Sequence, residues 1–274
     1  MTLAHTLVTA TGASPSRTML FLHGILGTKA NWRTLARRFV DARPDWAAML
    51  VDLREHGESL GLPGPDTVAQ CAKDLEALEA RAPAPLRGVL GHSFGGKVAL
   101  TWLAEREGPV DEAWIVDSMP GALPGGPATT DTSLILDLLG KVPELHPDGF
   151  ESRESFTDYV KAHGLPGGIA DWLAMNLKQD GRGRRYFALD VGRIAHLLES
   201  YCATDAWDAI EAPRPDTELH LVIGTRSSAY GPVERARADA AAAQATRVHV
   251  HYVDAGHWVH VDAPKALLDL LTSP

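Results

Sequence analysis

Short aliphatic and β-branched runs recur along the chain, and amphipathic segments separate them. Apolar runs of this length, bounded by glycine and polar residues, are typical of strands buried on both faces of a parallel sheet. The runs that predict strands are residues 4–12, 18–24, 47–57, 88–93, 112–118, 219–225 and 248–256. The segments that predict helices are residues 31–42, 67–79, 95–107, 233–245 and 264–271, the last with Asp262 as its cap and Pro264 just inside. This alternation predicts an α/β fold with a mostly parallel central sheet flanked by helices.

One stretch interrupts the alternation. From Gly121 to about Pro215 the sequence shows helical patterns with glycine and proline punctuation, but no convincing buried strand. A connection of roughly ninety residues is far longer than usual between two strands of one sheet, and long insertions often carry function. We therefore expect a helical lid at residues 121–215, inserted before the penultimate strand of a core formed by residues 1–120 and 216–274.

Composition narrows the classes of function. The 274 residues are 45% hydrophobic and 22% charged, and the formal net charge of −9 disfavours binding to nucleic-acid phosphates. No apolar run approaches the ~18 residues that cross a bilayer, and no signal peptide is evident, which predicts a soluble, cytoplasmic protein without a membrane span. Cys71 and Cys202 lie far apart without a Cys-x-x-Cys pattern, so we expect structural thiols rather than a disulfide or a zinc site.

A Gly-x-Ser-x-Gly motif lies between an expected strand and an expected helix. It occupies Gly91 to Gly95 within the segment VLGHSFGGKVAL. In this context the motif exposes a serine on a tight turn, because glycine lets strand and helix approach closely, and the helix N-terminus favours negative charge beside it. We predict that Ser93 is a catalytic nucleophile. The alternative interpretation is a glycine-rich structural turn.

A serine nucleophile needs a base, and we expect a histidine after the last strand. The segment DAGHWVH places His257 there, with Gly256 allowing the loop to bend the imidazole toward Ser93. His260 is the rival base, although it lies nearer the terminal helix and is better suited to packing or to lining the site.

The base needs an acid that orients it. In the commonest arrangement the acid follows the strand at 219–225, but the next residues, Arg226 to Tyr230, include no carboxylate. Asp117 closes the preceding strand, whose end lies at the same edge of the sheet, and we predict that it is the acid. The alternatives from the lid or the loops are Asp205, Asp208 and Glu234.

Attack on a carbonyl also needs donors for the oxyanion. The segment LHGILG turns directly after an early strand, so the backbone N–H of Ile25 is expected to face the same point as that of Phe94. His23 in this turn is expected to support the loop by hydrogen bonding and to border the substrate.

At these residues the chain resembles the α/β-hydrolase superfamily over its whole length. The segments that carry the resemblance are FLHGILGTKANW, VDLREHGES, GHSFGGKVAL, IVDSMPG and DAGHWVHVDAP, in that order. More narrowly, the chain is similar to small lidded bacterial acyl or acyl-CoA esterases. That resemblance implies a catalytic acid after the strand that ends at Asp117. The sequence departs from the usual motif at Glu55, where the family has glycine, which implies a change at the pocket rim and not in the triad.

Further side chains are candidates for contact with substrate. Those in the expected lid line the acyl site or form the core of the lid itself: Trp172, His196, Tyr201 and Trp207. Trp258, beside the predicted base, is a further candidate. The run from Arg182 to Arg185 is either an anion-binding patch or, as we prefer, a solvated face. His249 and His251 share one face of a strand, but no third metal ligand is evident.

Together these residues predict a serine hydrolase that cleaves small to medium carboxylic esters or thioesters through an acyl-Ser93 intermediate. It would need no metal or organic cofactor and would act as a monomer or homodimer. The alternatives with the same triad are a C–C bond hydrolase, a lyase of the menaquinone-pathway type and a cofactor-free perhydrolase. A non-catalytic ligand-binding module is a further alternative, because fold alone does not decide function.

Overall fold

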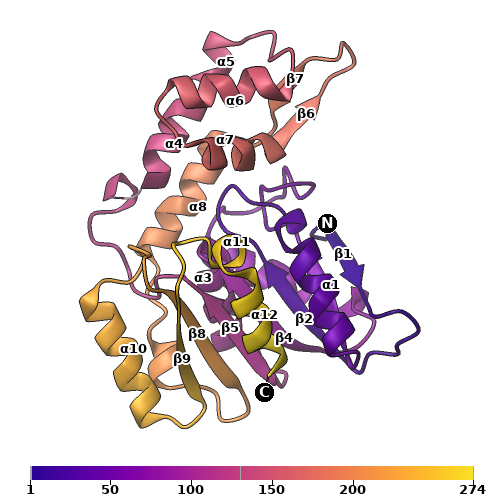
Figure 1. Cartoon of the computed structure of the whole chain (residues 1–274), viewed down its shortest axis with the longest axis vertical. Helices are drawn as coiled ribbons and strands as arrows, with labels where there is room; N and C mark the ends of the chain where they lie inside the picture. Colours follow the sequence, from indigo (N-terminus) through magenta and orange to yellow (C-terminus); the bar gives the residue numbers. More distant parts are fainter. Residues whose placement is uncertain (1, 130, 274) are drawn as a thin grey trace.

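The computed structural model describes residues 2–129 and 131–273. Its centre is a seven-stranded sheet in the order β1-β3-β2-β4-β5-β8-β9, in which only β1 runs antiparallel to its neighbour (Figure 1). The strands are β1 (His5–Val8), β2 (Arg17–Leu22), β3 (Trp46–Val51), β4 (Leu86–His92), β5 (Glu112–Val116), β8 (Glu218–Gly224) and β9 (Val248–Val253). Every strand expected from the apolar runs is confirmed, although β1 and β3 end well before the predicted bounds and β4 begins two residues earlier than predicted.

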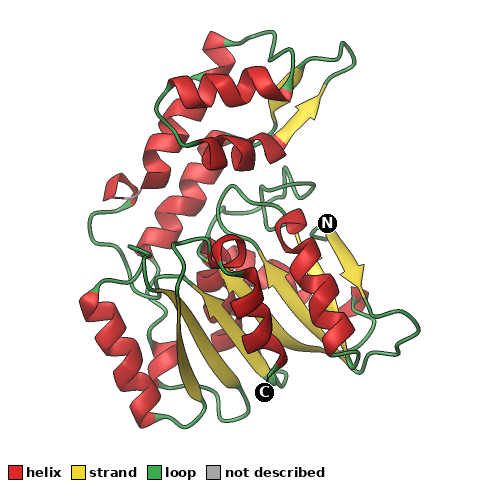
Figure 2. Ribbon diagram, viewed as in Figure 1, coloured by secondary structure: helices red, strands yellow, loops and turns green. Residues whose placement is uncertain are grey.

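Helices cover both faces of the sheet (Figure 2). On one face α1 (Arg33–Ala42) packs beside α12 (Pro264–Thr272). The helices on the other face are α2 (Val68–Glu76), α3 (Phe94–Glu105) and α10 (Pro232–Gln244). The short 3₁₀ helices η1 (Lys29–Trp32) and η2 (Glu79–Arg81) precede α1 and follow α2. These are the expected helices, and they explain why the inner strands are apolar on both faces.

One detail of the last helix differs from expectation. The helix α12 begins after Ala263, and Asp262 ends a separate short helix, α11 (Val259–Asp262). The Asp262 carboxylate accepts a hydrogen bond from the Gly256 N–H at 2.8 Å. The prediction that Asp262 caps α12 is therefore wrong, because its side chain turns back to hold the preceding loop.

The stretch between β5 and β8 forms a separate, mostly helical insertion above the carboxyl ends of the strands (Figure 1). Its elements are η3 (Pro127–Thr129), α4 (Asp131–Gly140), α5 (Val142–Leu145), α6 (Arg153–Ala162), α7 (Gly167–Leu173), η4 (Ala174–Asn176), β6 (Leu177–Gln179), β7 (Arg185–Phe187), α8 (Val191–Ala203) and α9 (Asp208–Glu211). Phe150 and Phe156 meet edge to face in its own small core, with ring centroids 5.1 Å apart. Every residue of the hairpin of β6 and β7 is exposed or half-buried, so the sequence has no buried apolar run that predicts these strands.

Two further expectations concern cysteines and membranes. Cys71 and Cys202 are both buried free thiols, as expected, and burial raises the pKa of each. Among the described residues, no helix combines the length and the apolar character that crossing a membrane requires.

Candidate active site

Ser93 lies on the turn between β4 and α3. Its φ of +51° is a left-handed conformation that a residue with a side chain rarely adopts, so the turn is strained. Glycines make the turn possible: a Cβ on Gly91 would lie 2.2 Å from the Gly95 carbonyl oxygen, and one on Gly95 would lie 2.5 Å from that of His23. The Ser93 N–H donates to the Val116 carbonyl of β5 at 3.0 Å, which anchors the turn to the sheet.

His257 reaches this turn from the loop after β9. Its Nε2 lies 3.0 Å from Ser93 Oγ, within hydrogen-bonding distance. The loop is held in place because His92 Nε2–H donates to the His257 carbonyl at 2.8 Å. The imidazole is therefore placed to accept the serine proton.

Asp117 lies on the far side of that imidazole. Its Oδ2 is 2.7 Å from His257 Nδ1, and the carboxylate is fully buried. It also accepts hydrogen bonds from the Gly224 N–H at 2.8 Å and from the Ser227 hydroxyl. These donors hold the carboxyl group in place, so that it accepts a hydrogen bond from His257 Nδ1–H and orients the imidazole.

The alternative acids lie elsewhere. Asp205 accepts the N–H of Trp207 at 3.0 Å, in the turn that leads into α9. Asp208 and Glu234 lie in the first turns of α9 and α10. The structure thus brings Asp117, and not these carboxylates, to His257.

The turn from Gly24 to Gly27 faces Ser93. A Gly27 N–H to Gly24 carbonyl bond of 3.0 Å closes it, and Leu26 has a φ of +63°. A Cβ on Gly24 would lie only 3.4 Å from the Ser93 Cβ, so the turn packs directly against the nucleophile. Among the described residues, the N–H groups of Ile25 and Phe94 have no hydrogen-bond acceptor. Both donors are available for an oxyanion.

Two buried histidines support this turn. His23 donates from Nδ1 to the Gly24 carbonyl at 2.8 Å and accepts the Leu53 N–H at Nε2, at 3.0 Å. His56 Nε2 accepts the Leu26 N–H at 3.0 Å. Burial lowers the pKa of His23, and burial lowers the pKa of His56 to about 3. Both rings therefore stay neutral and can accept these backbone bonds.

A cavity of about 410 Å³ opens beside Ser93 and His257. Its walls are mostly apolar and come from both the core and the insertion. The core side chains include Ile25, Trp32, Trp258 and Val261, and the insertion side chains include Ile135, Ile169, Trp172 and Met175. Trp172 and Trp258 face each other across the two parts, with ring centroids 5.4 Å apart. The cavity suits an apolar group next to the nucleophile.

Of the residues predicted to contact substrate, His23, Trp172 and Trp258 border this cavity, and His260 also lines it. Three others do not border it. His196 is exposed on α8, Tyr201 packs against Phe94 with ring centroids 6.1 Å apart, and Trp207 is buried. The structure does not place these three at the cavity wall: Tyr201 and Trp207 are buried where the insertion packs on α3 and α10.

Lys97 contacts both the backbone and the ring of Tyr201. The Nζ of this buried lysine of α3 donates to the carbonyls of Gly121, Tyr201 and Thr204 at 2.7–3.0 Å, and lies 3.9 Å from the centre of the Tyr201 ring. Burial lowers the pKa of Lys97 to about 8. One lysine side chain thus ties the start of the insertion and the end of α8 to the helix that follows Ser93.

The remaining candidate groups lie away from the cavity. Arg184, in the basic run, donates to the carbonyls of Asp148 and Gly149 within the insertion. His249 and His251 stack with His220 of β8. No group of three or more metal-ligating side chains placed to hold an ion is found among the described residues.

Several wall residues were not predicted from the sequence. Trp32, Ile135, Ile169 and Met175 lie in helical segments, where an apolar residue that faces a cavity has the same pattern as one that faces a core. For Ile135, Ile169 and Met175 the available signal is their position in the insertion, because a helical insertion above a nucleophile turns some of its apolar surface toward that nucleophile.

The fold and this site define a class. A model of the alpha/beta hydrolase family matches residues 19–270, and the chain belongs to that family. Among curated proteins, the sn-1-specific diacylglycerol lipase ABHD11 of Mus musculus is 28% identical over 256 residues, which cover 93% of this chain and 80% of the other. Esterase YbfF of Escherichia coli strain K12 is 24% identical over 251 residues, covering 91% and 89%.

Solved structures show the same architecture. A marine microorganism esterase superposes with a TM-score of 0.80 at 19% identity, covering 98% of this chain and 97% of the other. The thioesterase domain from the curacin biosynthetic pathway superposes with a TM-score of 0.69 at 20% identity, covering 100% of both chains. At these identities the likeness supports the fold, and function must be argued from the site.

Proposed function

We propose that this chain is a carboxylic ester hydrolase that acts through an acyl-Ser93 intermediate. The observation that carries the proposal is the continuous contact from Ser93 Oγ to His257 Nε2 at 3.0 Å and from His257 Nδ1 to Asp117 at 2.7 Å, beside an apolar cavity. The names of its relatives, a diacylglycerol lipase and an esterase, point to the same bond type.

In this mechanism His257 Nε2 takes the Ser93 proton while Oγ attacks the ester carbonyl carbon. The negative charge that forms on the carbonyl oxygen accepts hydrogen bonds from the Ile25 and Phe94 N–H groups. His257 then returns its proton to the departing alkoxide or thiolate. Water attacks the acyl-serine with His257 again as base, which releases the acid and restores the serine. Asp117 stays ionised and stabilises the imidazolium.

The insertion is proposed to act as the lid of this site. It supplies Ile135, Ile169, Trp172 and Met175 to the wall, so substrate must pass between it and the core. A volume of about 410 Å³ lies near the lower end of the range for small-molecule pockets, which favours small to medium acyl groups.

Hydrolysis of p-nitrophenyl esters from acetate to dodecanoate tests the proposal. We expect turnover of the short and medium esters, labelling of the protein by a fluorophosphonate, and loss of both in Ser93→Ala. Turnover that survives in Ser93→Ala would refute the acyl-serine mechanism. A folded wild-type protein that neither turns over esters nor takes the label would refute the assignment as a serine hydrolase.

A further inference from the structure

We propose that the insertion also positions the oxyanion donor, through Asn176 and Arg193. These two side chains hold the loops that set the Ile25 N–H, so the lid is a working part of the catalytic site as well as its cover. The inference rests on the proposed function and deepens it, because it makes docking of the insertion a condition for stabilising the transition state.

Backbone strain points to this role. Among the described residues, the non-glycine residues with positive φ are Leu26, Glu55, Ser93 and Asp117. Ser93 and Asp117 belong to the triad. Such a conformation is strained and persists only where its surroundings enforce it. Leu26 and Glu55 are the other pair, and a side chain of the insertion holds each of them.

Leu26 is held from both sides. Its N–H donates to His56 Nε2 at 3.0 Å, and its carbonyl accepts a hydrogen bond from Asn176 Nδ2 at 2.7 Å. Asn176 ends η4 in the insertion and is buried. Leu26 follows Ile25 in the turn, so contacts that hold both of its polar groups limit how far the turn that carries the Ile25 N–H can move.

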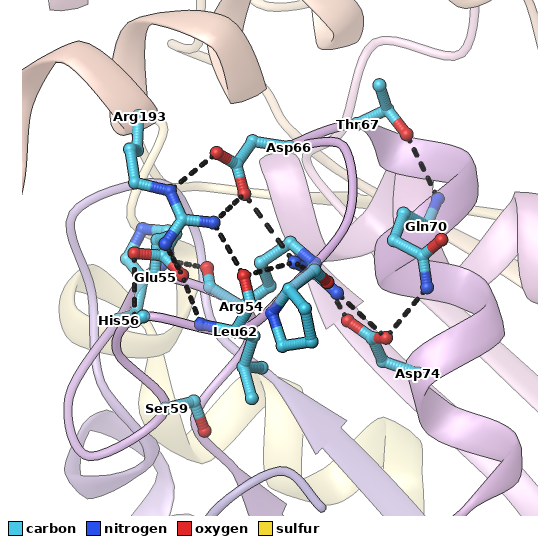
Figure 3. A network of polar contacts seen from close by, with 12 residues as sticks. Arg54, Glu55, His56, Ser59, Leu62, Asp66, Thr67, Gln70, Asp74 and Arg193 are labelled. Atoms are coloured by element: carbon cyan, nitrogen blue, oxygen red, sulfur yellow. Dashed lines mark hydrogen bonds and ion pairs between the residues drawn. The ribbon is translucent and has the colours of Figure 1, made fainter. Parts of the chain in front are cut away.

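Glu55 is held by Arg193 of α8 (Figure 3). A guanidinium nitrogen of Arg193 lies 2.8 Å from Glu55 Oε1, and the same group pairs with Asp66 at 2.7 Å and donates to the Leu62 carbonyl at 2.7 Å. Glu55 in turn accepts the N–H groups of Gly61 and Leu62 at 3.2 and 3.1 Å. This buried carboxylate therefore joins the loop to the insertion.

The two contacts converge on His56. Glu55 precedes His56 in the chain. The His56 Nδ1–H donates to the Arg54 carbonyl at 2.8 Å. Arg54 is itself clamped by Asp74, with contacts of 2.9 and 3.0 Å (Figure 3). Arg193 thus holds the loop that carries His56. His56 accepts the Leu26 N–H, and Asn176 donates to the Leu26 carbonyl.

This arrangement predicts which kinetic constant changes when Asn176 or Arg193 is substituted. An oxyanion donor acts in the transition state and not on bound substrate, so displacing it lowers kcat and leaves KM nearly unchanged. Removing one donor outright costs about 10²–10³ in kcat, and we expect a displaced donor to cost about tenfold.

The test compares Asn176→Ala and Arg193→Gln with wild-type enzyme. For both variants we expect kcat to fall about tenfold, with KM within about twofold. The loss should be equal for acetate and hexanoate esters. Affinity for a trifluoromethyl ketone, which forms a tetrahedral adduct with serine, should weaken by the same factor as kcat. Titration with a fluorophosphonate gives kcat per active site and so corrects for misfolded protein.

Two matched variants control for general damage to the insertion. Arg184→Gln removes an arginine whose partners all lie within the insertion, and Thr157→Val removes a buried hydroxyl that bonds only within α6. Both should keep wild-type kcat. Arg193→Lys keeps the charge but not the forked geometry, so its kcat should lie between those of wild type and Arg193→Gln.

Glu55→Gly distinguishes the effect of backbone strain at residue 55 from the effect of the ion pair with Arg193 of the insertion. Glycine tolerates a φ of +60°, so this change relieves the backbone while it removes the contact with Arg193. We expect kcat to fall despite the relief. Unchanged kcat in Asn176→Ala and Arg193→Gln would overturn the inference, and so would a loss that lies in KM and grows with acyl length. Inactive wild-type enzyme would instead refute the proposed function itself.

Discussion

Two clusters of histidines lie on the same sheet and differ in what surrounds them. One lies at the carboxyl ends of the strands and consists of His23, His56, His92, His257 and His260. The other lies on β8 and β9 and consists of His220, His249 and His251, stacked on Trp114. Both bring imidazole rings within 4.7–5.3 Å of one another.

The difference lies in the partners. In the first cluster His257 has a buried carboxylate on one nitrogen and a serine hydroxyl on the other, while His23 and His56 accept backbone N–H groups. In the second, His220 meets His251 at 3.0 Å and His249 meets Glu218 at 2.9 Å, and no nucleophile among the described residues contacts these rings. Clustered histidines do not make a site, because the chemistry comes from the groups that orient each ring.

The sharpest test of this difference is Asp117→Asn. The amide can no longer accept the His257 Nδ1 proton as a carboxylate does, so the base takes the wrong tautomer. We expect kcat to fall about 10⁴-fold with the fold retained. The measurement is ester turnover per active site, with circular dichroism as the check on folding. Near-wild-type turnover would show that another group orients His257.

His56→Ala tests the histidines of the first cluster that hold the backbone near Ser93. It leaves the Leu26 N–H buried without an acceptor and releases the turn that carries Ile25. We expect kcat to fall about tenfold to a hundredfold with little change in KM. His56→Gln, whose carbonyl oxygen is also an acceptor, should recover part of the activity. Equal damage in both variants would indicate that packing, and not this hydrogen bond, explains the loss.

These contrasts also show which features the sequence predicts. The strands and the candidate triad follow from local patterns: apolar runs indicate the sheet, a Gly-x-Ser-x-Gly turn indicates Ser93, and a strand end indicates Asp117. Asn176 and Arg193 have no such mark, since a polar residue in a helical segment is usually solvated. Their partners, Leu26 and Glu55, lie about 140–150 residues away and meet them only in the folded chain.

His196 and Tyr201 illustrate the same limit. Both lie on α8, within the stretch where the sequence predicts helical structure without giving the bounds of single helices. The pattern cannot tell which face meets the cavity, because that depends on how the insertion packs on the core. At Glu55 the departure from the family's glycine was visible in the sequence. Its meaning depended on Arg193, which only the tertiary structure brings to it.

His260→Phe tests a ring of the first cluster that lacks a polar partner. His260 Nδ1 is buried and has no hydrogen-bond partner in the part of the chain that the structure describes, and the ring packs on Trp32 with centroids 4.8 Å apart. Phenylalanine keeps that packing, so we expect kcat/KM to fall by about threefold, less than 1 kcal/mol of transition-state binding. A loss as large as that of a triad variant would make His260 the base, as the sequence had left open.

The same variant should change the response to acid. Burial and the neighbouring His257 lower the pKa of His260 to about 4. Between pH 6.5 and 4 the unfolded chain binds a proton that the folded chain does not, so stability falls as the pH falls through this window. Phenylalanine cannot titrate, and His260→Phe should lose less stability from pH 7 to pH 5 than wild type in thermal melts.

His220→Phe should give the smallest effect on catalysis and complete the comparison. Burial, and then His249 and His251, lower the pKa of His220 to about 3, so its contribution to stability is present above pH 6.5 and is lost as the pH falls toward 3. Phenylalanine preserves the stacking on Trp114, whose ring centroid lies 3.7 Å away, and removes the titration. We expect unchanged kcat and KM at pH 7.5, with a melting temperature that falls less between pH 7 and pH 5 than in wild type. A change in kcat would contradict the separation of the two clusters, and an unchanged acid response would show that His220 is not what titrates there.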